Sequence, residues 1–178
     1  LMLVASAVLA ACGGDAGAGG GAAATPTPFT LSATATPRVQ GAPSNGASFG
    51  AVTLSGAQSG IFTVETVSAF ALDGNLTLTL GLIGGKVLVF DLPLELMQPG
   101  RVELGDPDTA PAFASLTDAS AATYLSTSGG ITFSATSDEI FAAEFSFEAG
   151  AQIDEGIAAP DLTVSGTISD IRVAGEAG

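Results

Sequence analysis

Apolar and polar residues alternate along two neighbouring stretches in the first half of the chain. Residues 76–82 carry Leu at every second position, with Thr or Gly between. Residues 61–72 place four large apolar side chains on one parity, namely Phe62, Val64, Phe70 and Leu72. A period of two is typical of a strand with one buried face. We therefore expect both stretches to be strands whose even-numbered apolar residues face a core.

Turn residues separate these strands from each other and from a third one. Asp73-Gly74 lies between the first two, and Asp-Gly between alternating runs predicts a tight hairpin. Gly84-Gly85 then leads into residues 87–92, which are apolar on both faces and indicate a central strand. Pro93 ends that strand, because proline cannot donate to a sheet ladder.

The second half of the chain repeats the pattern with aromatic residues. We expect short strands at residues 122–126 and 131–135, joined by a turn at Ser128-Gly129-Gly130. Residues 141–148 alternate inward Phe or Ala with outward Glu or Ser, as in an antiparallel sheet with one wet side. The apolar parity of residues 162–173 changes near Ser169-Asp170, which predicts a β-bulge there.

Helical periodicity is weak by comparison. Residues 94–97 and 112–122 are the two helix candidates, and residues 101–111 look like a loop or a frayed edge. Eight or more short strands favour an all-β fold, first an antiparallel β-sandwich and second a small β-barrel. We place this β-domain at residues 48–174, with a short tail at 175–178.

An apolar stretch of eleven residues, 1–11, precedes the chain's single cysteine, Cys12. It is too short to span a bilayer, which takes about 20 apolar residues. Leu9-Ala10-Ala11-Cys12 resembles the lipobox of bacterial lipoprotein precursors. The resemblance implies that residues 1–11 are a signal peptide, that the Cys12 thiol receives a diacylglycerol, and that the new amino group is acylated, commonly with palmitate. Because the positive region of such signals is missing before Leu1, we expect the precursor to start upstream.

The resemblance also implies a location. Gly13, rather than Asp, follows Cys12, which is similar to the signal for transfer to the outer membrane of Gram-negative bacteria. Residues 12–47 would then be a flexible tether, since residues 13–24 are all Gly or Ala except Asp15, and prolines follow. Residues 29–36 form a possible first strand within it.

A second resemblance covers residues 124–173. Their strands, with the segments ITFSATSDEI, FSFEA and LTVSGTISDIRV, are similar to the C-terminal part of an uncharacterised family of bacterial lipoproteins. That family pairs a lipobox with a small β-sandwich. The resemblance implies a fold and an anchor, but it brings no activity and no catalytic residue.

Composition narrows the chemistry. The chain has no His, and its only Cys is assigned to lipid, so triads built on His and nearly all catalytic zinc sites are excluded. A Ser-Lys pair would have to use Lys86, the only lysine, which we expect to be a solvated strand-end residue. A net charge of −14 disfavours nucleic acid, whose phosphates it would repel. We therefore expect a protein that is not an enzyme.

Three acidic residues, Glu103, Asp106 and Asp108, are the candidate ligands of a calcium ion, which takes six to eight oxygen ligands. The competing interpretation is a solvated acidic surface that favours solubility. For the whole protein, the first hypothesis is a monomeric, membrane-anchored, non-enzymatic module that has a structural role or binds an unknown protein partner. The alternatives are a carrier of a small apolar ligand or lipid, and a calcium-binding surface module. We expect no other cofactor.

Overall fold

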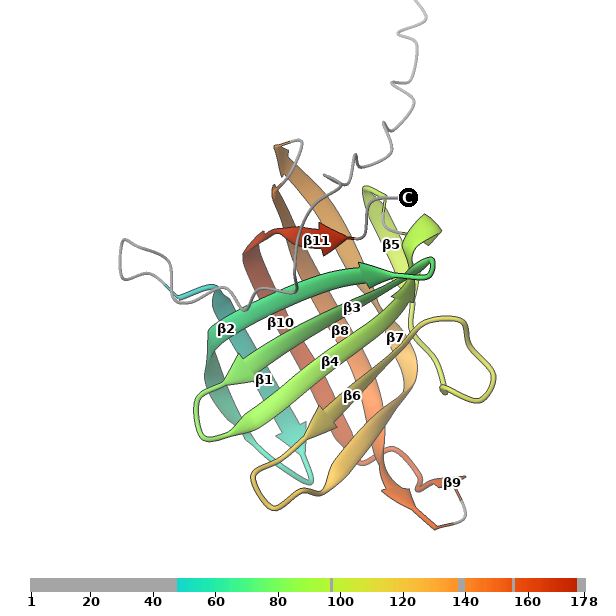
Figure 1. Cartoon of the computed structure of the whole chain (residues 1–178). Helices are drawn as coiled ribbons and strands as arrows, with labels where there is room; N and C mark the ends of the chain where they lie inside the picture. Colours follow the sequence, from blue (N-terminus) through green and yellow to red (C-terminus); the bar gives the residue numbers. More distant parts are fainter. Residues whose placement is uncertain (1–47, 97, 138–139, 155, 176–178) are drawn as a thin grey trace, which may run out of the picture.

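The computed structural model describes residues 48–96, 98–137, 140–154 and 156–175, and almost all of the regular structure in these ranges is β-strand (Figure 1). The all-β prediction is confirmed. The elements are β1 (Gly50–Gly56), β2 (Gly60–Leu72), β3 (Asn75–Leu82), β4 (Lys86–Pro93), the 3-10 helix η1 (Leu94–Leu96), β5 (Gly100–Glu103), β6 (Phe113–Thr117), β7 (Thr123–Ser137), β8 (Ile140–Ile153), β9 (Gly156–Ile157), β10 (Leu162–Ile171) and β11 (Val173–Gly175).

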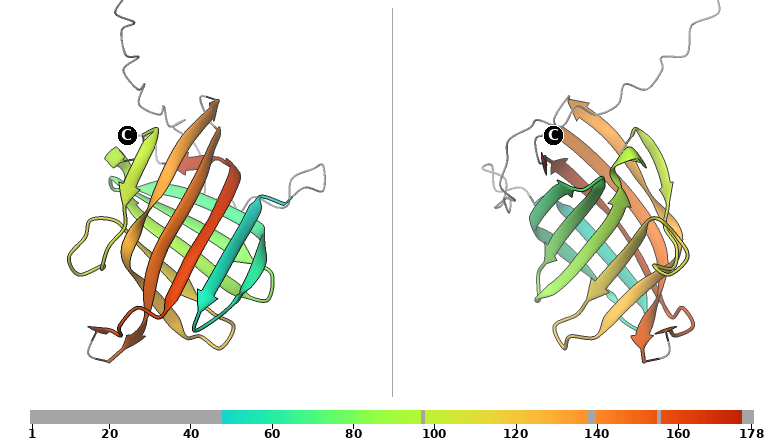
Figure 2. Two further views of the ribbon diagram at one scale, coloured as in Figure 1. Left: turned by 180° about the vertical axis from the view of Figure 1, so that it is seen from behind. Right: turned by 45° about the vertical axis from the view of Figure 1, so that its right-hand side comes forward.

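Eight of these strands close into an antiparallel barrel. Their order is β7-β6-β4-β3-β2-β1-β10-β8, and β8 pairs with β7 to complete the circle. Figure 2 shows the closed wall from two further sides. The barrel is the second of the two architectures expected from the sequence, and the β-sandwich is not confirmed. The difference arises from the long strands β7 and β8, which pair with each other along most of their length and so join the two ends of the sheet.

The barrel interior is filled by side chains of the chain itself. Leu residues of β3 and β4 are fully buried, as are Ile131 and Val164 from the opposite side of the barrel. In the middle, the Phe90 ring of β4 meets two rings of β8: its centroid lies 5.1 Å from that of Phe145 and 6.0 Å from that of Phe147, both edge to face. Such aromatic pairs add stability beyond the area that they bury.

One turn prediction and one bulge prediction are confirmed. Asp73 and Gly74 both have positive φ, 50° and 80°, as a type I′ turn between hairpin strands requires. The register of β10 against β8 shifts between Ile168 and Ile171, and Asp170 within this shift has a φ of 58°. The bulge expected near Ser169-Asp170 therefore exists and allows both Ile168 and Ile171 to face the core.

The prediction for residues 61–72 is half wrong. The register of β2 against β3 shifts between Val64 and Thr66, so the buried parity changes inside the strand. After the shift, Val67, Ala69 and Ala71 are buried, whereas Leu72 is 43% exposed. A bulge adds one residue to one strand, which moves every later side chain to the other face.

Two further local predictions are wrong. The Ser128-Gly129-Gly130 segment does not turn the chain; it lies inside β7, which runs unbroken from Thr123 to Ser137. Residues 112–122, a helix candidate, form β6 and the turn that follows it. The alternation of buried Ala114 and Leu116 with half-buried neighbours fits a strand, and only the short length of the run obscured it. Of the helix candidate at residues 94–97, Leu94–Leu96 form the 3-10 turn η1, and Met97 lies outside the described residues.

Strands β5 and β6 both lie along the same long neighbour. β6 pairs with the first part of β7 and β5 with its middle, and residues 104–112 form an excursion between them. Gly105 N donates to Ala112 O at 3.1 Å and so closes the base of this excursion. Within the described residues, β5 ends the strand order, whereas β6 has β4 on its other side.

Ser126 of β7 connects β6 to the loop that follows β5. Its hydroxyl accepts a hydrogen bond from Ala114 N at 2.9 Å and donates one to Gly105 O at 2.6 Å. It is fully buried and is the one polar residue in the buried set of the described chain. The hydroxyl thus satisfies two backbone groups that the interrupted ladder would leave unpaired.

Replacing Ser126 by Ala should therefore lower the free energy of unfolding by about 1–3 kcal/mol, because a buried N–H and a buried C=O lose their partner. Urea unfolding measures this difference. Ser128→Ala, at an exposed position two residues away, is the matched control and should change stability by less than about 0.5 kcal/mol. Equal losses for both variants would contradict the bridging role.

Candidate functional site

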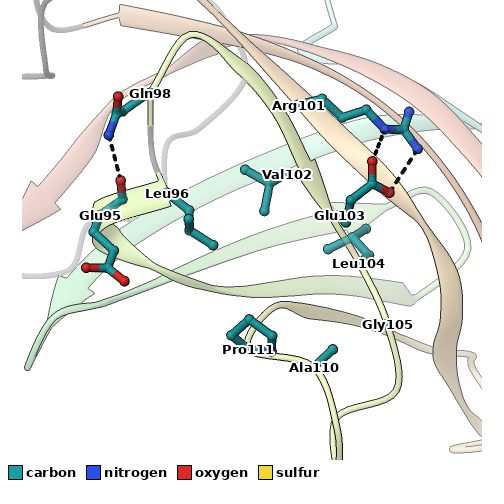
Figure 3. Close-up of a pocket in the computed structure, with 10 residues that line it drawn as sticks. All are labelled: Glu95, Leu96, Gln98, Arg101, Val102, Glu103, Leu104, Gly105, Ala110 and Pro111. Carbon is teal, nitrogen blue, oxygen red and sulfur yellow. Dashed lines mark hydrogen bonds and ion pairs between the residues drawn. The ribbon is translucent and has the colours of Figure 1, made fainter. Parts of the chain in front are cut away.

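The barrel wall has a break beside β5. Strand β4 ends at Pro93, and the chain turns through η1 before it returns as β5, so these two segments of wall do not pair. Between them lies a surface groove with a volume of about 400 Å³, a size common among ligand sites. Figure 3 shows its lining, which consists of Glu95, Leu96, Gln98, Arg101, Val102, Glu103, Leu104, Gly105, Ala110 and Pro111.

The groove has an apolar floor. Val102 and Leu104 belong to the barrel core and are 6% and 4% exposed. Leu96 of η1 and Pro111 of the 105–111 loop are exposed and also line the groove. In Figure 3 the side chains of Leu96 and Val102 lie toward each other across the groove. An apolar surface is therefore open to solvent where the wall is broken.

One side of the groove is the edge of β5. Leu104 N donates to Gly129 O of β7 at 3.0 Å. In an antiparallel ladder, the residues that bond to a given neighbour alternate with residues whose N–H and C=O point the other way. The backbone groups of Arg101 and Glu103 therefore point away from β7. Since β5 pairs with β7 alone among the described strands, this edge faces the groove.

The outer rim of the groove is charged. Arg101 Nε donates to Glu103 Oε1 at 2.7 Å, and both side chains are more than half exposed. This hydrogen bond raises the pKa of Arg101 and lowers that of Glu103. Glu95 lies across the groove, where its backbone oxygen accepts a bond from the Gln98 amide at 3.0 Å. The exposed Arg101–Glu103 ion pair adds little to the stability of the protein. The rim carries two acidic side chains, Glu95 and Glu103, and one basic side chain, Arg101.

The three candidate calcium ligands do not come together in one site. The Glu103 carboxylate is bonded to Arg101, while the Asp106 carboxylate accepts the N–H of Asp108 at 2.9 Å and shapes the loop. Asp106 O also accepts the N–H groups of Thr109 and Ala110. Across the described ranges, no three His, Cys, Asp or Glu side chains form a group that could hold a metal ion. The structure thus places Asp106 in a turn and Glu103 on the groove rim.

A second polar cluster closes the opposite end of the barrel. Lys86 Nζ donates to Gln58 Oε1 at 2.7 Å and lies 5.3 Å from the centroid of the Phe62 ring. Gln58 Nε2 in turn donates to Asp118 Oδ2 at 2.8 Å. This cluster joins the β1–β2, β3–β4 and β6–β7 turns. Lys86 is therefore half-buried and bonded, rather than the solvated strand-end lysine expected from the sequence.

Asp118 organises the β6–β7 turn within this cluster. Its Oδ1 accepts the Ser120 hydroxyl at 2.6 Å and the backbone N–H groups of Ser120 and Ala122. Hydrogen bonds from Ser120, followed by those from Ala122 and Gln58, favour the charged carboxylate and lower the pKa of Asp118 below its ordinary value of 3.8. The stabilisation that the carboxylate provides is thus fully present above that ordinary value and is lost as the pH falls through the lower, folded-state pKa.

Asp118→Asn should accordingly lower the melting temperature at neutral pH, and the difference from the natural chain should shrink as the pH falls below the pKa of folded Asp118. Thermal melts over a pH series measure both effects. Asp154→Asn is the control, because that residue is exposed in the β8–β9 turn. A difference that stays constant down to strong acid would show that the charge of Asp118 does not stabilise the turn.

The lipidation candidate Cys12 and the possible strand at residues 29–36 lie outside the described residues. Residues 101–111, expected to be a loop or a frayed edge, form most of the edge strand β5 and the loop after it, whereas no sequence pattern predicted the groove. Leu96 and Pro111 stand fifteen positions apart and carry no shared motif. Only the closure of the barrel brings them to one groove.

No family model matches the chain, and comparison with curated proteins and with solved structures also gives no match. The resemblances to bacterial lipoproteins therefore stay predictions from the sequence. Among the described residues, no helix is long and apolar enough to cross a membrane.

Proposed function

We propose that this protein is a bacterial lipoprotein, held at the outer membrane by lipid on Cys12, whose barrel is a non-enzymatic module that binds another protein. The lipobox at Leu9–Cys12 and the Gly/Ala-rich residues 13–24 support the anchor and the spacer. Two or three acyl chains anchor a protein stably, whereas one chain binds only marginally. The partner would meet the barrel near the membrane surface, at a distance that the tether sets.

The observation that carries the interaction role is the packed interior of the barrel. Phe90, Phe145 and Phe147 meet at its centre, so the inside is occupied by the chain. What the protein offers to other molecules is its outer surface, including the groove beside β5. A carrier of an apolar ligand would first have to displace these rings, and no observed contact favours that role over binding through the surface.

The anchor is tested by comparing the natural precursor with Cys12→Ser in a Gram-negative host. After cell lysis and centrifugation, the natural protein should sediment with membranes and enter solution only with detergent. The variant should lose its lipid and shift largely to the soluble fraction. Ser6→Ala, within the signal but away from Leu9–Cys12, is the control and should still sediment. Soluble natural protein would contradict the anchor.

A further inference from the structure

We propose that the edge of β5 that has no strand partner among the described residues is a docking site, which pairs with an extended, basic peptide segment of the partner. This inference rests on the proposed function and names its binding site and the chemistry of its partner. Addition of a strand to an open sheet edge is a common mode of peptide recognition, in which backbone hydrogen bonds give affinity and side-chain pockets give specificity.

The geometry of β5 supplies the backbone half of this recognition. Arg101 and Glu103 each direct one N–H and one C=O away from β7 and toward the groove, as the register of β5 on β7 requires. An incoming strand would lie in the break between β5 and η1 and would extend the sheet by one member. The edge is only four residues long, so binding takes a short segment of the partner.

The floor of the groove supplies the apolar half. Leu96 and Pro111 are exposed in the lining of the groove, together with the nearly buried Val102 and Leu104. Because side chains alternate along a strand, one or two apolar residues of the added strand would face this floor while their neighbours face water. The burial of Leu96, which is 36% exposed in the free chain, would contribute to affinity.

Charge complementarity selects the partner. Glu95 and Glu103 line the groove, Asp106 and Asp108 lie in the adjoining loop, and Arg101 is the one base among these residues. The whole chain, these residues included, carries a net charge of −14, which attracts cations and accelerates their association. A strand flanked by Lys or Arg therefore fits better than a neutral one. The chain's own residues 29–36 alternate apolar and polar side chains but carry no charge.

A labelled peptide, acetyl-KRTVTVTRK-amide, tests the proposal against the full mature chain by fluorescence anisotropy. It should bind in a saturable way, and its affinity should fall as salt is added. The acidic counterpart acetyl-EETVTVTEE-amide should bind at least about tenfold more weakly, because it meets like charge at the rim. A basic peptide with N-methylated amides on its pairing edge should also lose about tenfold, since it keeps the charge but cannot complete the ladder.

Two variants of one residue separate the backbone from the side chain. Glu103→Ala removes the carboxylate and keeps the N–H, whereas Glu103→Pro also removes the outward N–H and leaves the bonds of Val102 to β7 available. Glu103→Pro should bind the basic peptide about tenfold more weakly than Glu103→Ala. Circular dichroism and melting temperatures establish that both are folded, and the N-methylated peptide tests the same bond on the natural chain.

Amide hydrogen exchange provides the residue-level result. On binding, the Arg101 and Glu103 amides should gain protection while that of Val102, already paired, stays unchanged. Full protection of Arg101 and Glu103 in the free chain would overturn the proposal, because the edge would already be occupied by residues 29–36 or by a second copy. Equal binding of the acidic and basic peptides, or of the N-methylated one, would also overturn it. In the Cys12 experiment, a natural protein that is soluble without detergent would instead contradict the proposed anchor and leave the peptide result standing.

Discussion

Phe90→Ala should cost about 3–5 kcal/mol of the free energy of unfolding, the range for removal of a fully buried phenylalanine ring. Phe90 is 0% exposed, and it is the ring through which β4 meets Phe145 and Phe147 of β8. Its loss removes buried apolar area, two edge-to-face contacts and the packing of the barrel centre. Because a domain of this size is stable by about 5–15 kcal/mol, the variant should lose a large share of its stability.

The control for this prediction is Phe113→Ala. Phe113 lies on β6, opposite Asp91 in the register with β4, and its side chain is half-buried on the outer face. Its removal should cost about 1 kcal/mol. Urea unfolding of both variants, with equal dependence on urea concentration, measures the difference directly. Similar losses at the two positions would show that the aromatic cluster does not hold the barrel interior together.

Gly129→Ala is the second large prediction. Gly129 has a φ of 128°, a region that L side chains rarely adopt, and a Cβ there would overlap Phe147 Cα and the Ser146 carbonyl oxygen of β8. The strain of such a backbone costs about 1–3 kcal/mol, and overpacking against a backbone costs about 1–3 kcal/mol more. We expect a loss of about 3 kcal/mol, together with weaker pairing of β7 with β8.

The neighbouring glycine is the matched control. The nearest atoms to a Cβ on Gly130 would be those of the Arg101 guanidinium, about 2.8 Å away, at the far end of an exposed and flexible side chain. Arg101 can move aside, so Gly130→Ala should cost less than about 1 kcal/mol. If both alanine variants unfolded at the same urea concentration, the close approach of β7 to β8 at Gly129 would not be the reason for the glycine.

These glycines also show where prediction from the sequence fails. Gly-Gly after a short alternating run is typical of a turn, yet here it allows two long strands to approach each other at a bulge. A sequence records the freedom of glycine but not the neighbour that requires it. By contrast, Asp73-Gly74 was predictable, because the hairpin turn depends only on adjacent residues.

The same distinction explains the other results. The inward parity of β3 and of the Phe residues in β8 followed from local alternation and is confirmed. Closure into a barrel depends on the pairing of β7 with β8 and on its register, for which alternation carries no information. The β2 bulge was missed because Phe70 and Leu72 are large and apolar on the outer face, so size pointed to the wrong parity.

The groove is predictable only in part. Pro93, Pro107 and Pro111 indicate that the region is irregular. Glu103 is a charged residue, and charged residues are common on edge strands. The apolar floor could not be foreseen, since Leu96 and Val102 each look like ordinary core residues in the sequence. Leu96 and Val102 line the same groove only because β4 and β5 do not pair, which follows from how the strands are arranged in the barrel.

The central claim, a barrel held to a bacterial membrane by lipid on Cys12, is tested most directly by the intact mass of the mature protein. The natural precursor is expressed in a Gram-negative host, extracted with detergent and measured by mass spectrometry. We expect a chain that begins at Cys12 and carries a diacylglycerol on the thiol and an acyl group on the amino terminus. A mature chain that keeps residues before Cys12, or one that begins at Cys12 with an unmodified thiol, would contradict it.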